Sequence, residues 1–320
     1  MSFKVIGIGE VLWDLMPAGK QLGGAPANFA HHARSLGADA VVITRVGEDD
    51  LGREILRRFN EMEIAAGVVQ IDARKPTGTV AVLLGEGGVP QFTIHEDAAW
   101  DWLAPSDAAR KVSGEADAIC FGSLAQRNPV SRASIQQLLA ATPPGALRVF
   151  DINLRQHFYS REVIEQSLRL ANVLKLNDAE LPVLAAMFDL GPHPRQQIQR
   201  LAQHFELKLV ALTRGPQGSL LYQDGRWSEH LSEPLQVVDT VGAGDAFTAA
   251  LTVGLLNKFD LDEVHATASA VARFVCSHAG ATPALPAHLR NTFANGNGQI
   301  SAPAAKIDPL PASTIAKPSG

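Results

Sequence analysis

The sequence has little cysteine, no large excess of either charge, and no long apolar run. Two cysteines, Cys120 and Cys276, occur in 320 residues, far apart and both in apolar surroundings. They predict core thiols in a reducing compartment rather than a disulfide framework. No apolar stretch is long enough to cross a membrane, and residues 1–6 show no signal-peptide pattern. We therefore expect a cytoplasmic protein without a membrane partner.

The charge pattern argues against a nucleic-acid partner. The formal net charge is −5, both signs are scattered, and no basic block alternates with aromatic residues. The hydrophobic content of 46% suits one large α/β domain with a small appendage, or two domains. After about Leu289 the composition turns to Ala, Pro, Ser and Lys, which bury little apolar surface. This predicts a folded domain over 1–290 and a loosely ordered tail over 291–320.

The stretch that carries most chemistry is D-T-V-G-A-G-D-A-F at 239–247. Gly242 and Gly244 allow backbone N–H groups to converge, and the apolar run that follows predicts a helix whose amino end is positive. Together they predict an anion hole for a phosphoryl group. Asp245 stands where it could take a proton from an attacking hydroxyl. The alternative is an ordinary glycine turn with Asp245 as a helix cap.

A second candidate site lies near the amino terminus. Residues 4–8 predict a buried strand, and Glu10 and Asp14 follow at its carboxyl end, where open parallel sheets bind ligands. Asp14 suits a polyol, because a carboxylate offers only acceptors, but an aspartate after a strand is also a common turn residue. A helix is predicted from about Pro26 to Leu36, and Asn28 is either a sugar contact or a polar residue of the helix start.

Three motifs together resemble the signature regions of the ribokinase (PfkB) family of sugar kinases. They are G-G-A-P-A-N-F-A at 23–30, R-V-G-E-D-D-L-G at 45–52, and the stretch at 239–247. Within that family, G-E-V-L-W-D at 9–14 and D-A-A-W-D at 97–101 look most like fructokinases. The resemblance implies a ribokinase-like three-layer α/β/α sandwich, with a mostly parallel central sheet and a small β-lid.

The resemblance also implies how a sugar would be held. Short β-like runs at 68–71, 78–84 and 91–94 have the spacing of hairpins, and the family has a lid here, from about 11–22 and 72–98. The alternative is a surface hairpin without substrate contact.

Asp151, Asn153 and Arg155 alternate along a predicted strand and its exit, so all three share one face if that strand continues. Arg155 is either a ligand contact or part of a structural ion pair. The sugar-contacting residues expected are Asp14, Gly23, Gly24, Asn28, Phe92, Trp100 and Arg155.

ATP and its metal ion would lie at the other end of the site. The N-x-x-E pair Asn177 and Glu180 resembles the family's Mg²⁺ position, with most contacts through water; a helix capping box would look the same. By the same resemblance, His278 lies where relatives bind adenine, and K⁺ is a candidate ligand near Asp239. The nucleotide-contacting residues expected are Asn177, Thr213, Gly215, Gly218, Gly242, Gly244 and His278.

The predicted function is ATP-dependent phosphorylation of a sugar hydroxyl, with fructose as the leading substrate. Asp245 would be the base, and Gly242, Ala243 and Gly244 would stabilise the phosphoryl charge. The alternatives are 2-keto-3-deoxygluconate, ribose or a nucleoside as substrate, or a sugar-binding regulator without catalysis. A dinucleotide oxidoreductase is disfavoured, because no G-x-G-x-x-G follows the first strand. A homodimer joined through the lids is also predicted, since an exposed sheet edge needs covering.

Overall fold

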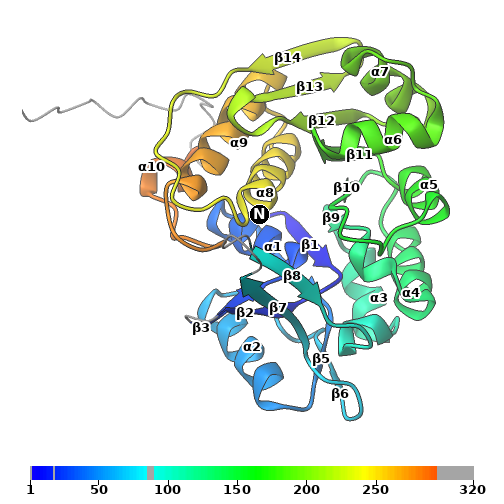
Figure 1. Cartoon of the computed structure of the whole chain (residues 1–320), viewed down its shortest axis with the longest axis vertical. Coiled ribbons are helices and arrows are strands. Elements are labelled where there is room, and N and C mark those ends of the chain that lie inside the picture. The colour runs from blue at the N-terminus through cyan, green and yellow to red at the C-terminus, as the bar shows by residue number, and fades with distance from the viewer. Residues whose placement is uncertain (1, 17–18, 85–89, 294–320) are drawn as a thin grey trace, which may run out of the picture.

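The computed structural model describes residues 2–16, 19–84 and 90–293, and its centre is an eight-stranded sheet (Figure 1). The strand order is β14-β13-β12-β11-β10-β9-β1-β4. All neighbours from β12 to β4 pair in parallel, whereas β13 and β14 add an antiparallel hairpin. The strands are β1 (Lys4–Ile8), β4 (Asp39–Ile43), β9 (Ala118–Phe121), β10 (Leu147–Asp151), β11 (Val173–Asn177), β12 (Leu209–Thr213), β13 (Ser219–Gln223) and β14 (Arg226–His230).

Helices cover both faces of this sheet, which confirms the predicted α/β fold. One buried cluster joins one sheet face to helices α3 to α7, and a second joins the opposite face to α1, α8, α9 and α10. Buried on both faces, the parallel strands are runs of apolar residues rather than alternating ones. The helices are α1 (Ala25–Ser35), α2 (Asp50–Glu61), α3 (Asp107–Gly114), α4 (Pro129–Ala140), α5 (Arg161–Leu170), α6 (Glu180–Phe188), α7 (Pro194–His204), α8 (Ala243–Leu256), α9 (Leu261–Cys276) and α10 (Ala287–Arg290).

A second, four-stranded sheet has the order β3-β2-β7-β8 and is built from the segments predicted as a lid. One predicted strand lies elsewhere: the run at 68–71 contributes to β6, which pairs in parallel with β5 outside this sheet. Strands β4 and β5 are separated by Thr44, whose hydroxyl donates to Gly9 O at 2.7 Å. The strands are β2 (Leu12–Met16), β3 (Gly19–Gly23), β5 (Arg45–Gly47), β6 (Gln70–Asp72), β7 (Gly78–Leu84) and β8 (Pro90–Ile94).

The order of the main sheet fixes where a ligand can bind. The chain passes from β1 to β4 on one side and later returns to β9 on the other side of β1. At such a switch point the loops after neighbouring strands diverge and leave a crevice at their carboxyl ends. The segment containing Glu10 and Asp14 leaves the sheet at this point, and β10 and β11 end along the same edge.

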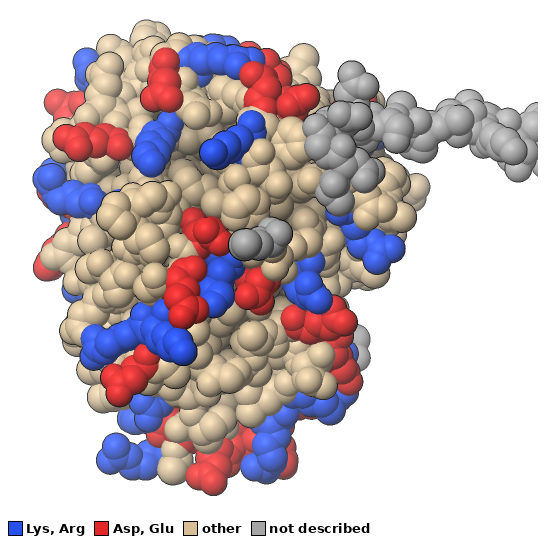
Figure 2. All heavy atoms as spheres, turned by 180° about the vertical axis from the view of Figure 1, so that it is seen from behind, with Lys and Arg blue, Asp and Glu red and all other residues tan. Residues whose placement is uncertain are grey.

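The surface shows no area dominated by one charge on the face drawn in Figure 2, where acidic and basic side chains are interspersed. Several of the exposed charges form ion pairs, such as Arg226 with Asp260 and Asp262. Over the described residues, no helix combines the length and the apolar character needed to span a membrane.

The folded core extends slightly past the predicted boundary at residue 290. Phe293 is buried, its ring centroid lies 5.4 Å from that of Phe259, and it packs in the cluster that holds α8 and α9. Thr292 is also buried. From residue 294 on, the predicted tail lies outside the described residues.

Phe293 therefore generates a stability prediction. A chain ending at Arg290 should unfold with a free energy about 3 kcal/mol lower than a chain ending at Phe293, because it loses a buried phenylalanine. Urea unfolding of the two chains measures the difference, and the longer chain is the matched control. Equal free energies of unfolding would show that Phe293 does not belong to the core.

Candidate active site

One large cleft, with a volume of 1540 Å³, follows the carboxyl edge of the main sheet. Residues of the small sheet and of α1 line one end, and residues after β12 and around α8 line the other. The first end gathers Glu10, Asp14, Gly23, Gly24, Asn28 and Arg155. The second gathers Asn177, Glu180, Thr213, Gly215, Gly218 and Gly242, and Asp245 also lines the cleft. A single cleft thus holds most of the residues predicted for sugar and nucleotide.

The amino end of α8 forms one wall of the cleft. Gly242 caps the helix with φ 76°, a left-handed conformation that favours glycine. A Cβ on Gly242 would also lie 2.5 Å from Ala281 O, so this turn can pack against the loop after α9 only as glycine. Among the described residues, the N–H groups of Gly244 and Asp245 have no hydrogen-bond partner, whereas Ala243 N donates to Thr240 O at 3.3 Å. The helix therefore presents free donors and its positive end to the cleft.

Asp245 lies in the first turn of α8 and is half-buried. Its Oδ2 accepts a hydrogen bond of 2.8 Å from Asn28 Nδ2, which ties α8 to α1. Burial and the nearby Asp151 carboxylate raise the pKa of Asp245 to about 6, although Asn28, Lys175 and Arg155 oppose the shift. The carboxylate is thus ionised near neutral pH and more basic than an ordinary aspartate, as a general base requires.

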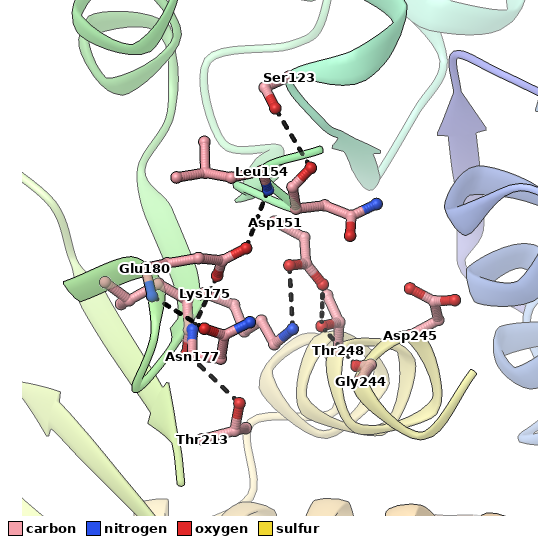
Figure 3. A network of polar contacts seen from close by, with 12 residues as sticks. Ser123, Asp151, Leu154, Lys175, Asn177, Glu180, Thr213, Gly244, Asp245 and Thr248 are labelled. Atoms are coloured by element: carbon pink, nitrogen blue, oxygen red, sulfur yellow. Dashed lines mark hydrogen bonds and ion pairs between the residues drawn. The ribbon is translucent and has the colours of Figure 1, made fainter. Parts of the chain in front are cut away.

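Behind the amino end of α8 lies a buried polar network (Figure 3). Lys175 Nζ donates to Asp151 Oδ1 at 3.0 Å, and the Thr248 hydroxyl donates to Asp151 Oδ2 at 2.8 Å. Asp151 ends β10, Lys175 belongs to β11 and Thr248 to α8, so one carboxylate joins two strands to the helix. The side chains of Lys175 and Asp151 are each 8% exposed.

The sugar end is predominantly acidic. The Asp14 carboxylate extends over Gly23, where a Cβ would lie 2.6 Å from Asp14 Oδ2. Burial raises the pKa of Asp14, and the Arg155 guanidinium opposes that shift. Glu10 is 2% exposed with Oε2 unpartnered, and burial raises its pKa to about 7. This part of the cleft thus offers several carboxyl oxygens, with the Arg155 guanidinium near them.

The exit of β10 differs from the sequence expectation. β10 ends at Asp151 and Asn153 adopts φ 49°, so the strand does not continue to Arg155. The predicted alternation of Asp151, Asn153 and Arg155 on one strand face is therefore wrong. Arg155 is exposed, and it lines the cleft from a loop.

Asn177 and Glu180 form a capping box, the alternative that the sequence left open. Asn177 Oδ1 accepts from Ala179 N and Glu180 N, each at 2.9 Å. The Glu180 carboxylate accepts from Asn177 N at 2.8 Å and from Leu154 N at 2.9 Å, and it is buried. Both residues still line the cleft, so a contact to Mg²⁺ through water stays a prediction.

Three predicted site residues do not line the cleft among its described residues. Trp100 is 1% exposed and stacks under the Arg127 guanidinium, 4.1 Å from the ring centroid, so it is a packing residue. His278 is exposed and packs on Phe274. Asp239 instead accepts from Val241 N and Gly280 N, each at 3.0 Å, and joins two loops; its cation role stays a prediction. The side chain of Phe92 lies outside the described part of the chain.

Sequence reasoning gave no role to Lys175 and Glu10, two charged residues that line the cleft. Lys175 interrupts an otherwise apolar strand, V-L-K-L, and a lysine in a buried strand is itself a signal, because such a charge needs a partner. Glu10 was placed at a strand end without a role, although it directly follows Gly9 at the carboxyl end of the first strand.

Residues 14–288 match the pfkB family of carbohydrate kinases. The chain therefore belongs to the PfkB family of carbohydrate kinases and is a sugar kinase by family.

Curated relatives and solved structures extend that result. A fructokinase from Klebsiella pneumoniae is 31% identical over 266 residues, which cover 80% of this chain and 85% of the relative. An uncharacterized sugar kinase from Pyrococcus horikoshii, PH1459, has a structure in complex with ATP that matches with a TM-score of 0.75 and 29% identity, over 88% of this chain and 94% of that one. A fructokinase with bound ATP from Xylella fastidiosa, 23% identical, shares the fold with a TM-score of 0.79 over 89% of this chain and 96% of that one.

The raised pKa of Asp245 predicts the pH dependence of turnover. A base acts as its carboxylate, so kcat/KM should fall as pH drops below about 6. If the base had the pKa of an unperturbed aspartate, this acidic limb of the pH profile would lie near pH 4, about two units lower. A pH profile from 4.5 to 8.5 at saturating ATP measures it.

Glu10→Gln is the control, because Glu10 also lines the cleft and burial raises its pKa to about 7. Since the raised pKa of Asp245 comes from its burial and from Asp151, the Glu10→Gln variant should keep the loss of activity below about pH 6. Disappearance of the limb in Glu10→Gln would assign it to Glu10 instead.

Proposed function

We propose that this kinase transfers the γ-phosphoryl group of ATP to a hydroxyl of a neutral sugar, with D-fructose as the preferred acceptor. The observation that carries the proposal is the position of Asp245. It lies in the first turn of α8, accepts a hydrogen bond from Asn28, and lines the same cleft as Asp14 and Thr213. A sugar at one end and ATP at the other would meet beside this carboxylate.

The reaction follows from the residues around that meeting point. Asp245 accepts the proton of the attacking hydroxyl, and the sugar oxygen forms a bond to the γ-phosphorus. The bond between this phosphorus and the bridging oxygen breaks, and ADP leaves with that electron pair. The free N–H groups of Gly244 and Asp245, at the amino end of α8, stabilise the equatorial phosphoryl oxygens. Asn28 holds Asp245 in place through the 2.8 Å hydrogen bond.

The metal ion implied by ATP fits the cleft in a limited way. Among the described residues, no group of three or more His, Cys, Asp and Glu side chains is placed to hold a metal. Asn177 and Glu180 already accept backbone hydrogen bonds, so they suit contacts through water to Mg²⁺ held mainly by phosphates. When bound, Mg²⁺ would neutralise phosphate charge. K⁺ near Asp239 and a homodimer through the small sheet also remain predictions.

The charge balance of the sugar end supports a neutral acceptor. Arg155 interacts with the carboxyl groups of Glu10, Asp14 and Asp245, so its charge is already opposed. A sugar acid would bring one more carboxylate into this set. The sequence of the Klebsiella pneumoniae fructokinase, 31% identical, and the motifs at 9–14 and 97–101 point to fructose within the neutral sugars.

Replacing the proposed base tests the mechanism. Asp245→Asn should lower kcat by about 10²–10⁴-fold, because it removes the proton acceptor while keeping the shape of the side chain. Sugar binding, measured by calorimetry, should change little. Asp262→Asn is the matched control, because Asp262 is an exposed aspartate in the first turn of the neighbouring helix α9. A variant Asp245→Asn with more than a tenth of wild-type kcat would remove Asp245 from the base role.

A panel of acceptors tests the substrate. D-Fructose should give the highest kcat/KM among fructose, ribose, 2-keto-3-deoxygluconate and adenosine in an ATP-coupled assay. Discrimination should come from hydroxyl groups that the carboxylates of the cleft are placed to bind, since an unpaired buried polar group is penalised strongly. A tenfold preference for one of the other three, about 1.4 kcal/mol of transition-state binding, would overturn fructose and leave the kinase assignment standing.

A further inference from the structure

Lys175 is a buried lysine in a strand whose neighbouring residues are apolar. Val173, Leu174 and Leu176 of β11 are each at most 1% exposed, and the Lys175 side chain is 8% exposed. A buried ammonium is costly unless it is paired. The carboxylate of Asp151, 3.0 Å away, is the partner that permits it. Burial lowers the pKa of Lys175 and the carboxylates around it raise that pKa, with a net upward shift, so the ammonium is charged.

The position of the Lys175 ammonium is electrostatically unfavourable in the protein without a bound ligand. A Cβ on Gly244 would lie 3.0 Å from Lys175 Nζ, which places the ammonium against the first turn of α8. The amino end of a helix carries a partial positive charge, so a cation there is repelled. Figure 3 shows Lys175 between Asp151 and this turn. A bound anion in the cleft would turn the repulsion into attraction, and the free N–H groups of the same turn would add to it.

Lys175 has further donors and lies in the cleft. An ammonium has three N–H donors, and the described contact to Asp151 uses one. Lys175, Gly244 and Asp245 all line the same cleft. Because Gly244 has no side chain, that residue does not separate Lys175 Nζ from the part of the cleft next to the first turn of α8.

We propose that Lys175 is a phosphoryl-binding residue of this kinase, held by Asp151 and Thr248 under the amino end of α8. Its ammonium stabilises the negative charge of the phosphoryl group in flight, alongside the N–H groups of Gly244 and Asp245. This inference rests on the proposed function and adds a residue to it. It also explains Gly244 in this chain, because the glycine lets the lysine approach.

The test uses the double variant Asp151→Asn with Lys175→Met. Lys175→Met alone would leave a buried unpaired carboxylate and destabilise the fold, whereas the double variant removes both charges and keeps an acceptor for Thr248. We expect the double variant to fold and to have a kcat about a hundredfold lower than wild type. A loss of this size is typical when an enzyme loses one hydrogen-bond donor to the charge that develops in the transition state. The KM for the sugar should stay within threefold. Lys208→Met, an exposed lysine beside the amino end of β12, is the control and should leave kcat unchanged.

A binding measurement tests the same inference without turnover. Aluminium fluoride with ADP mimics a phosphoryl group in flight, and calorimetry gives its affinity for each protein. The double variant should bind ADP alone as wild type does, and should bind ADP with aluminium fluoride at least tenfold more weakly. A folded double variant that keeps kcat within threefold of wild type, or keeps its affinity for ADP with aluminium fluoride, would overturn the role of Lys175.

The two proposals fail in different ways. Suppose that the wild-type protein phosphorylates none of the sugars tested, and that the double variant binds ADP with aluminium fluoride more weakly than wild type does. The acceptor assignment then fails and the role of Lys175 stands. If wild type is an active sugar kinase and the double variant is equally active, the role of Lys175 fails and the proposed function stands.

Discussion

The candidate site depends on how the amino end of α8 meets the carboxyl edge of the main sheet. Three contacts hold the helix there: Gly242 against Ala281, Asn28 on Asp245, and Thr248 on Asp151. The partner residues come from segments far apart in the sequence. The result brings a basic carboxylate, free N–H groups and a buried ammonium to one point. Such a concentration of charge is costly for a fold without a ligand.

Most of the fold could be predicted from the sequence, because parallel strands buried on both faces and glycine-ended helices leave strong local patterns. Helix α1 was predicted from about Pro26 to Leu36 and is observed at Ala25–Ser35. The errors arose where tertiary contacts override local pattern. The run at 68–71 looked like part of the lid, but pairing is decided by the partner strand, and β6 pairs with β5. Phe293 looked like tail, because its neighbours in sequence are polar and its contacts are with α8 and α9.

The parts of the candidate site in which the backbone conformation requires glycine could be predicted from the sequence. Contacts between side chains of residues distant in the sequence could be predicted less well. The glycines at 242 and 244 with the following acid predicted a helix start, and α8 begins there with Gly242 as its cap. Trp100 was expected to face the sugar, yet a large ring beside Gly78 and Arg127 fills the core instead. Lys175 was missed because its partner, Asp151, belongs to another strand, and no local pattern links the two. The capping contacts of Asn177 and Glu180 likewise look the same in sequence with or without a metal ion.

The central claim is that sugar and ATP meet at Asp245. A crystal structure with D-fructose and a non-hydrolysable ATP analogue tests it most directly, through the distance from the Asp245 carboxylate to the nearest sugar hydroxyl. The account predicts a hydrogen-bond distance, about 2.6–3.2 Å, with that hydroxyl facing the γ-phosphorus. A sugar hydroxyl that faces the γ-phosphorus from another part of the cleft, beyond hydrogen-bond reach of Asp245, would contradict it.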